Sequence, residues 1–148
     1  MFKLNKKGFT LVEILLVIVI IAILAAIVIV AINPGRQISQ ANNTQRSSDV
    51  TTILNATHQY GIDNRGVLPT AITATPTVVG SGTGQINICS LLVPTYIAAM
   101  PFDPTADGAL YTSCTTYDTG YTISVDTAGR LTVSAPSAEL SETISVTR

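Results

Sequence analysis

The sequence predicts an α+β protein in which a long, bent N-terminal helix packs on a small antiparallel β-sheet head. Three patterns predict this: a purely apolar run from Ile14 to Ile32, a helical pattern that resumes after residue 36, and alternating residues near the C-terminus. Of the 148 residues, 47% are hydrophobic and 11% are charged, against about 25% charged in ordinary soluble domains. Because the apolar excess lies in the first quarter, we expect one modest domain with an apolar N-terminal segment.

The apolar segment is long enough to span a membrane. From Phe9 onward it would form a helix of ~36 Å at about 1.5 Å per residue, and a bilayer core is about 30 Å thick. Lys3, Lys6 and Lys7 precede it, and positive charge orients that end toward the cytoplasm. We therefore expect a single-pass protein of a bacterial-type cytoplasmic membrane, with a cytoplasmic N-terminus and an exported remainder.

Glu13 is a charged residue inside this segment. A carboxylate there is costly and usually has a partner or a function. Cleavage between Gly8 and Phe9 would create an α-amine four residues before Glu13, on the same helix face. Pairing of the two charges, within one copy or between an incoming copy and an older one, would offset that cost. Two alternatives remain: a plain anchor with Glu13 at the interface, and a secretory signal processed near Ala25-Ala26.

The run Lys7-Gly8-Phe9-Thr10-Leu11-Val12-Glu13, followed by β-branched apolar residues, resembles the class III signal of type IV prepilins and type II secretion pseudopilins. The resemblance covers residues 5–34. It implies cleavage after Gly8 by a prepilin peptidase, N-methylation of Phe9 and a role for Glu13 in assembly. The implied partners are that peptidase, the inner-membrane assembly machinery, the lipid bilayer before assembly, and other copies of the chain in a homopolymeric filament.

The expected organisation has four parts. These are a cleaved leader (1–8), a transmembrane and filament-core helix (9–33), the amphipathic half of the helix (34–61) and an extracellular head (62–148). Pro34 and Gly35 predict a kink between the two helical halves. The amphipathic half, over residues ~37–60, places its apolar residues on one face: Val50, Ile53, Leu54, Thr57 and Gly61.

The head shows the signals of a surface loop and of strands. Residues 70–85, rich in Thr, Pro, Ser and Gly, predict an extended loop. Alternation over residues 120–125 and 131–133, around a turn at 126–129, predicts a β-hairpin. Residues ~143–147 predict a short edge strand.

A second resemblance concerns the head. Leu92, Tyr96-Ile97 and Pro101-Phe102-Asp103-Pro104 are similar to a stretch of the major pseudopilins of type II secretion and of related pilins, although the Trp-Gly turn common in those pseudopilins is absent. In that family a calcium ion often ties the following loop. The oxygen ligands that this chain offers calcium are Asp103, Asp107, Asp118 and Asp126. Solvated turn aspartates are the alternative explanation.

Cys89 and Cys114 are the two cysteines of the chain. An even number in an exported chain permits one disulfide, worth about 3 kcal/mol for this separation, and two cysteines are too few for a cysteine-based metal centre.

The remaining composition narrows the function. A net charge of −1 without a basic cluster after residue 7 argues against nucleic-acid binding. The sole histidine, His58, is predicted on a helix surface, and without a nucleophile motif it does not indicate an enzyme. Apart from calcium, no cofactor is expected. The sequence thus predicts a structural subunit of an extracellular type IV pilus-like filament. The alternatives are a major-type pseudopilin of type II secretion, with a periplasmic filament, and a membrane-tethered binding protein that never polymerises.

Overall fold

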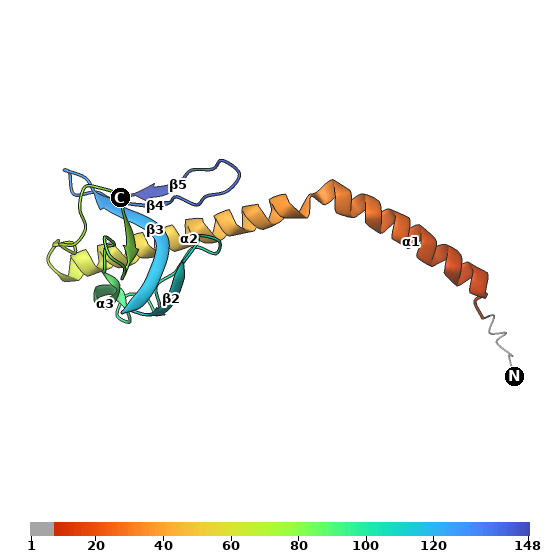
Figure 1. Ribbon diagram of the computed structural model, residues 1–148, viewed down its shortest axis with the longest axis horizontal. Coiled ribbons are helices and arrows are strands. Elements are labelled where there is room, and N and C mark those ends of the chain that lie inside the picture. Colours follow the sequence, from red (N-terminus) through yellow and green to blue (C-terminus); the bar gives the residue numbers. More distant parts are fainter. Residues whose placement is uncertain (1–7) are drawn as a thin grey trace, which may run out of the picture. The chain divides into compact units, whose positions relative to one another are not determined.

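The computed structural model describes residues 8–148 (Figure 1). Lys3, Lys6 and Lys7, and with them most of the predicted leader, lie outside the described residues. The chain divides into two compact units, one that ends at Gln37 and one that comprises Ile38–Arg148. The predicted α+β class is confirmed, because a long apolar helix is followed by a small antiparallel sheet.

Two helices account for the N-terminal part of the chain. Helix α1 comprises Leu11–Ile32 and ends at Asn33, whose φ of 48° lies in the left-handed region that terminates helices. Helix α2 comprises Pro34–Asp63 and begins with a proline, a residue that suits the first helical position. The break therefore falls where the sequence predicts it, whereas α2 extends about three residues beyond the expected range at each end.

The head contains a five-stranded antiparallel sheet with order β1-β3-β4-β5, and β2 also pairs with β3. The strands are β1 (Thr77–Gly80), β2 (Leu110–Ser113), β3 (Thr116–Val125), β4 (Leu131–Ala135) and β5 (Ile144–Thr147), and a one-turn helix α3 spans Cys89–Leu92. Strand β3 is central: its Asp118 is paired with Gly80 of β1 and with Leu110 of β2. Strands β3 and β4 form the predicted hairpin, and β5 is the predicted edge strand.

The core lies between α2 and the sheet (Figure 1). The predicted face of α2 is buried throughout, and Val50, Ile53 and Leu54 have no solvent exposure. The opposing sheet contributes alternate residues of β3 and β4, as expected for strands with one buried face: Tyr121, Ile123, Leu131 and Val133.

Two segments differ from the sequence prediction. The expected loop over residues 70–85 contains β1, because Val79 is fully buried and its carbonyl accepts a 2.7 Å hydrogen bond from the Thr119 hydroxyl. The prediction of a continuous loop is therefore wrong. Strand β2 was not expected, since it has only four residues and leaves Leu110 exposed.

Candidate functional site

The start of α1 is built by Thr10 and Glu13. The Thr10 hydroxyl accepts a hydrogen bond from the Glu13 N–H at 3.2 Å, and the Glu13 carboxylate accepts one from the Thr10 N–H at 3.5 Å. This reciprocal arrangement is a capping box, and it places a negative charge at the positive end of the helix dipole. Glu13 thus has a structural role in the chain as it stands, while its pairing with a Phe9 amine stays a prediction.

The surface of α1 is apolar on every side. None of its 22 residues is buried. Its apolar stretch also exceeds the 18 or so consecutive residues that indicate a membrane span. Among residues 8–148, α1 is the one helix that is both long enough and apolar enough to cross a bilayer. A helix that is apolar all round needs lipid or other helices around it.

Arg46 of α2 organises the head from within, with no solvent exposure. Its guanidinium donates to both carboxylate oxygens of Asp103, at 2.7 and 3.0 Å, and to Glu139 at 2.8 Å. Two further acceptors are Asn43 Oδ1 and the Thr105 hydroxyl. Arg46 thereby joins α2 to two segments that lie 57 and 93 residues further along the chain.

Charge pairing shifts the pKa values of these groups. The hydrogen bond to Asp103 outweighs burial and raises the pKa of Arg46 above its usual range. Burial alone would raise the pKa of Asp103, but hydrogen bonds from Arg46 and from the Thr105 and Ala106 N–H groups together lower it. The hydrogen bond from Arg46, aided by Asn42 and Ser39, likewise lowers the pKa of Glu139. Both carboxylates are therefore ionised at neutral pH.

Asn43 fastens the loop between β4 and β5 to α2. Its side-chain amide accepts from the Glu139 N–H at 2.9 Å and donates to the Glu139 carbonyl at 2.8 Å. The next residues, Leu140 and Ser141, both have a φ of 58°, a conformation that costs L-residues energy. The Leu140 side chain is 43% exposed. Asn43 thus holds the loop through the backbone of Glu139, directly before two residues in the left-handed backbone conformation.

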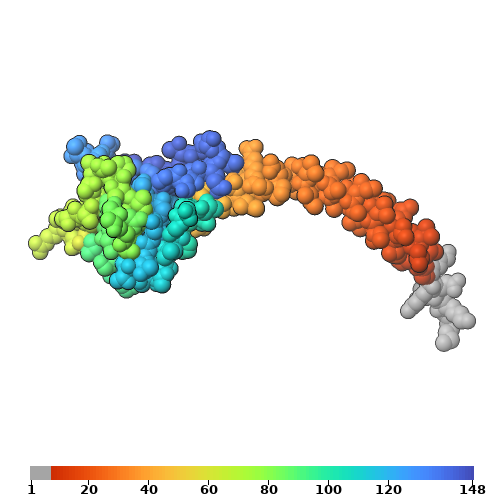
Figure 2. Space-filling view, viewed as in Figure 1, coloured from red at the N-terminus to blue at the C-terminus, as the bar shows by residue number. Residues whose placement is uncertain are grey.

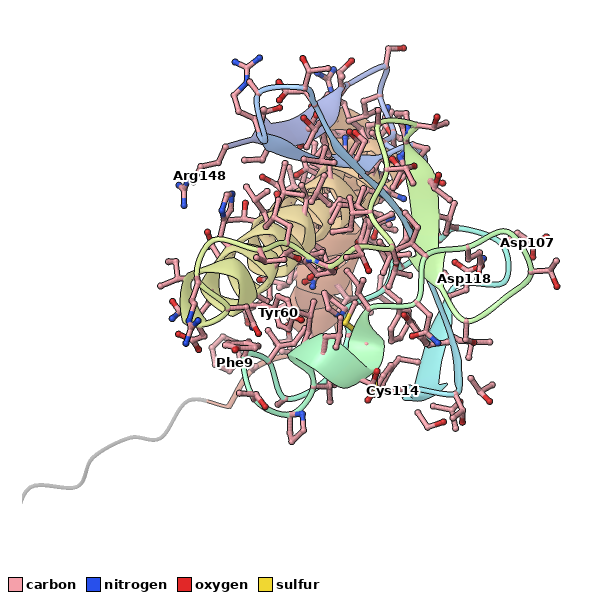
Figure 3. All side chains as sticks on the ribbon, turned by 90° about the vertical axis from the view of Figure 1, so that its left-hand side faces the viewer. Phe9, Tyr60, Asp107, Cys114, Asp118 and Arg148 are labelled. Atoms are coloured by element: carbon pink, nitrogen blue, oxygen red, sulfur yellow. A yellow bond between two sulfur atoms is a disulfide. The ribbon has the colours of Figure 1, made fainter. Side chains whose placement is uncertain are left out.

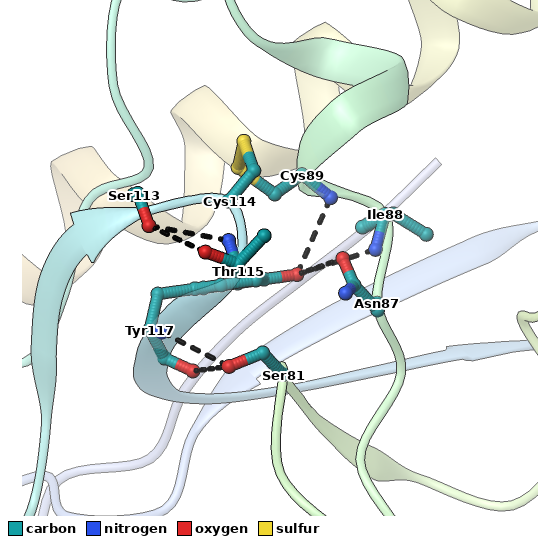
Figure 4. Close-up of a disulfide and its surroundings, with 8 residues drawn as sticks. All are labelled: Ser81, Asn87, Ile88, Cys89, Ser113, Cys114, Thr115 and Tyr117. Atoms are coloured by element: carbon teal, nitrogen blue, oxygen red, sulfur yellow. Dashed lines mark hydrogen bonds between the residues drawn. A yellow bond between two sulfur atoms is a disulfide. The ribbon is translucent and has the colours of Figure 1, made fainter.

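A disulfide joins Cys89 and Cys114, with a Cα–Cα distance of 5.2 Å, as predicted (Figure 4). Beside it, the Tyr117 hydroxyl accepts from the N–H groups of Ile88 and Cys89, both at 3.3 Å, and donates to Asn87 Oδ1 at 3.1 Å. The start of α3 is thereby held by a covalent bond to the turn between β2 and β3, and by a buried phenol to β3 itself.

The four predicted calcium ligands occupy different settings. Asp103 is engaged by Arg46, and Asp126 accepts from the Arg130 Nε at 2.7 Å. Asp118 accepts from the Gly120 N–H, and Figure 3 shows it on the same side of the head as Asp107. In residues 8–148, no group of three or more His, Cys, Asp or Glu side chains is arranged to hold a metal ion. Calcium binding at these aspartates stays a prediction.

His58 lies on α2, as predicted, and is half-buried there. It lines a hollow of about 180 Å³ with Gly61 and Leu68, and its Nε2 atom has no hydrogen-bond partner among the described residues. The segment after α2 folds back over this part of the helix, where the Gly66 N–H bonds to the Gly61 carbonyl, and this accounts for the partial burial of His58.

Sequence reasoning did not find the polar network of Arg46. The available signal was spacing, since Asn43, Arg46 and Val50 recur at intervals of three and four residues and so share a helix face. Polar residues on the apolar face of a helix require partners. Those partners lie too far along the chain to be named from the sequence.

These features define a class of protein: a single unpartnered apolar helix at the N-terminus, followed by an α+β head with a disulfide. Residues 3–29 match a family model described as the prokaryotic N-terminal methylation motif. This motif is the signature of the prepilin-type signals of type IV pilins and pseudopilins, and it supports a structural protein of the pilin-like or pseudopilin kind. No curated protein and no solved structure matches the chain.

Proposed function

We propose that this protein is the structural subunit of an extracellular type IV pilus-like filament, cleaved after Gly8 and assembled through α1. The observation that carries the proposal is the methylation motif on residues 3–29, which implies processing by a prepilin peptidase and polymerisation. The fully exposed apolar surface of α1 supports it, because lipid before assembly and neighbouring helices after assembly would both cover such a surface.

Cleavage would change the setting of Glu13. The new α-amine of Phe9 would compete with the Thr10 N–H for the Glu13 carboxylate, and a charged donor makes a stronger hydrogen bond than a neutral one. An amine from an incoming copy would meet the same carboxylate, so that insertion becomes directional. Glu13 is therefore the residue on which assembly should depend.

The chain offers a direct chemical readout of cleavage. All three of its lysines lie at positions 3, 6 and 7, so residues 9–148 contain none. After cleavage at Gly8, the α-amine of Phe9 would be the only primary amine of the protein. Mass spectrometry of filaments sheared from cells, with and without an amine-reactive label, would therefore report both cleavage and methylation at one position.

The decisive experiment compares Glu13→Gln with Thr10→Val in cells that express the full chain. We expect Glu13→Gln to be cleaved but to yield few or no filaments by electron microscopy, because the charge that draws in the amine is lost. Thr10→Val removes the other half of the capping box and keeps that charge, so filaments should persist. Normal filaments from Glu13→Gln, or a cell-associated protein that still begins at Met1, would refute the proposal.

A pseudopilin of type II secretion is the second candidate. The Pro101-Phe102-Asp103-Pro104 segment, which resembles that family, favours it. Filaments confined to the periplasm, together with loss of protein secretion when the gene is deleted, would favour this candidate over a surface pilus.

A further inference from the structure

We propose that Leu140 of one copy inserts into an apolar hollow beside Phe102 of a neighbouring copy, which gives the heads a head-to-tail contact. This inference rests on the proposed function, since it names the surface by which the heads of assembled copies meet. It is carried by the strained loop, the hollow, and their separation on α2.

The loop presents Leu140 at a cost. Leu140 and Ser141 are two consecutive non-glycine residues with positive φ, and a Cβ-bearing residue adopts this conformation only when its surroundings enforce it. Here the enforcement is visible: Asn43 binds both backbone groups of Glu139, and Arg46 binds its carboxylate. The strain exposes an apolar side chain instead of burying it. The Leu140 side chain is thereby fixed in place and left free for a contact outside this chain.

The hollow is suited to a leucine side chain. Its volume is about 370 Å³, and Phe102, which is 44% exposed, lies in one of its walls. That wall is entirely apolar: Ala99, Met100, Pro101, Phe102 and Pro104. The other wall is α2, through Gln45, Asp49 and Thr52. Asp49 is buried and already accepts hydrogen bonds from Tyr121 and Gln45. When Leu140 of one copy enters this hollow of a neighbour, the glutamates near it would therefore face no exposed carboxylate in the lining.

Leu140 does not line the hollow of its own chain. The residues that follow it, Glu142 and Ile144, border a separate groove with Gln40, Thr44 and Ser47 of α2. At about 100° per residue, that set and the set Gln45, Asp49 and Thr52 occupy different flanks of the helix. Figure 2 shows the C-terminal segment (dark blue) at the surface of the head.

Leu140 and the hollow beside Phe102 lie on different flanks, so the contact between two copies joins unlike surfaces and is heterologous. Any assembly of this kind ends with a free Leu140 at one end and an empty hollow at the other. Such contacts produce open arrays when their rotation does not close a ring. A filament is an array of this kind. A second copy of this chain is thus the occupant that both surfaces fit.

Disulfide trapping tests the contact in the full chain. Leu140→Cys and Ala99→Cys are introduced together, and sheared filaments are oxidised and separated by non-reducing electrophoresis. We expect a ladder of dimers, trimers and higher species that collapses on reduction, because each copy carries both halves of the contact. The control pair, Leu110→Cys with Ala99→Cys, also exposes two thiols and should give no ladder. Filaments without a ladder from the first pair overturn this inference and leave the proposed function standing, whereas an absence of wild-type filaments overturns the proposed function itself.

Two glycine variants separate contact from strain. Leu140→Gly relieves the positive φ and removes the side chain, while Ser141→Gly relieves the neighbouring strain and keeps Leu140. Both heads should melt at or above the wild-type temperature, so misfolding does not confuse the result. We expect filaments of Leu140→Gly to be recovered at a roughly tenfold lower yield after shearing and mild detergent, because the contact buries a leucine, and those of Ser141→Gly at the wild-type yield. Equal yields for the two variants would overturn the inference.

Discussion

Replacement of Arg46 by methionine is the sharpest test of how the head is held together. Methionine fills most of the volume of the arginine stem, so the principal change is the loss of the charge and of its five hydrogen bonds. Asp103, whose side chain has no solvent exposure, would keep only the N–H groups of Thr105 and Ala106 and a long hydrogen bond of 3.5 Å from the Thr105 hydroxyl. Removal of one partner from a buried ion pair costs about 3–5 kcal/mol, because the other charge stays buried without compensation.

That cost is large for a head of this size. Domains are stable by about 5–15 kcal/mol, and at roughly 4 °C per kcal/mol the melting temperature should fall by about 12–20 °C. The readout can be confined to the head: the chain has no tryptophan, and all five tyrosines lie within Ile38–Arg148. Near-ultraviolet circular dichroism of the full chain in detergent therefore reports the unfolding of the head while α1 stays silent.

Two further variants and a change of pH identify the cause. Arg46→Met with Asp103→Asn should recover part of the loss, since an amide is cheaper to bury than an orphaned carboxylate. Arg130→Met breaks an exposed pair with Asp126 and should change little. Because the pKa of Asp103 is lowered in the folded wild type, its contribution is present above pH ~4 and is lost as the pH falls. The gap between wild type and Arg46→Met should therefore narrow in acid. A melting temperature within 3 °C of wild type at pH 7, or a gap that does not change with pH, would refute the ion-pair argument.

Two other predictions follow from buried groups. Replacement of both Cys89 and Cys114 by alanine should lower the stability of the head by about 3 kcal/mol, measurable as a lower melting temperature of the full chain. Intact wild-type protein should take up no alkylating agent until it is reduced. Uptake before reduction would contradict the disulfide. Burial raises the pKa of Asp49 despite its hydrogen bonds to Tyr121 and Gln45, so the folded state favours the protonated form, and ionisation at neutral pH opposes stability. The melting temperature of Asp49→Asn relative to wild type should therefore be higher at pH 7 than at pH 4. The reverse order would show that the carboxylate is stabilising.

The sequence predicts those parts of the fold that arise from local chemistry. The break after Ile32, the buried face of α2 and the β3–β4 hairpin all follow from residues close in the chain, through proline, helical spacing and strand alternation. Strand β1 was missed because Thr77–Gly80 lies in a stretch of turn-forming residues, and pairing with the distant strand β3 decides its conformation.

The candidate site divides along the same line. Gly8, Phe9 and Glu13 lie within one short motif and are readable from the sequence, as is the pairing of the two cysteines. The Arg46 network and the positive φ of Leu140 are not, because each depends on contacts between segments more than fifty residues apart. Asp103 illustrates the difference: the sequence identifies it as a turn aspartate with a carboxylate free for calcium, whereas in the fold it is the buried partner of Arg46.

The disulfide also has a mechanical consequence. In the filament proposed above, each subunit would bear tension along its chain, and a head pulled by its ends lengthens only by the residues free to straighten. Cys89 and Cys114 are 25 residues apart in sequence, so the bond removes about 85 Å of extensible contour at roughly 3.5 Å per residue. The withheld segment includes α3, the 99–104 wall and β2. Under load, this segment of the head would keep its connectivity even after its strands have separated, and refolding would start from a loop that is already closed.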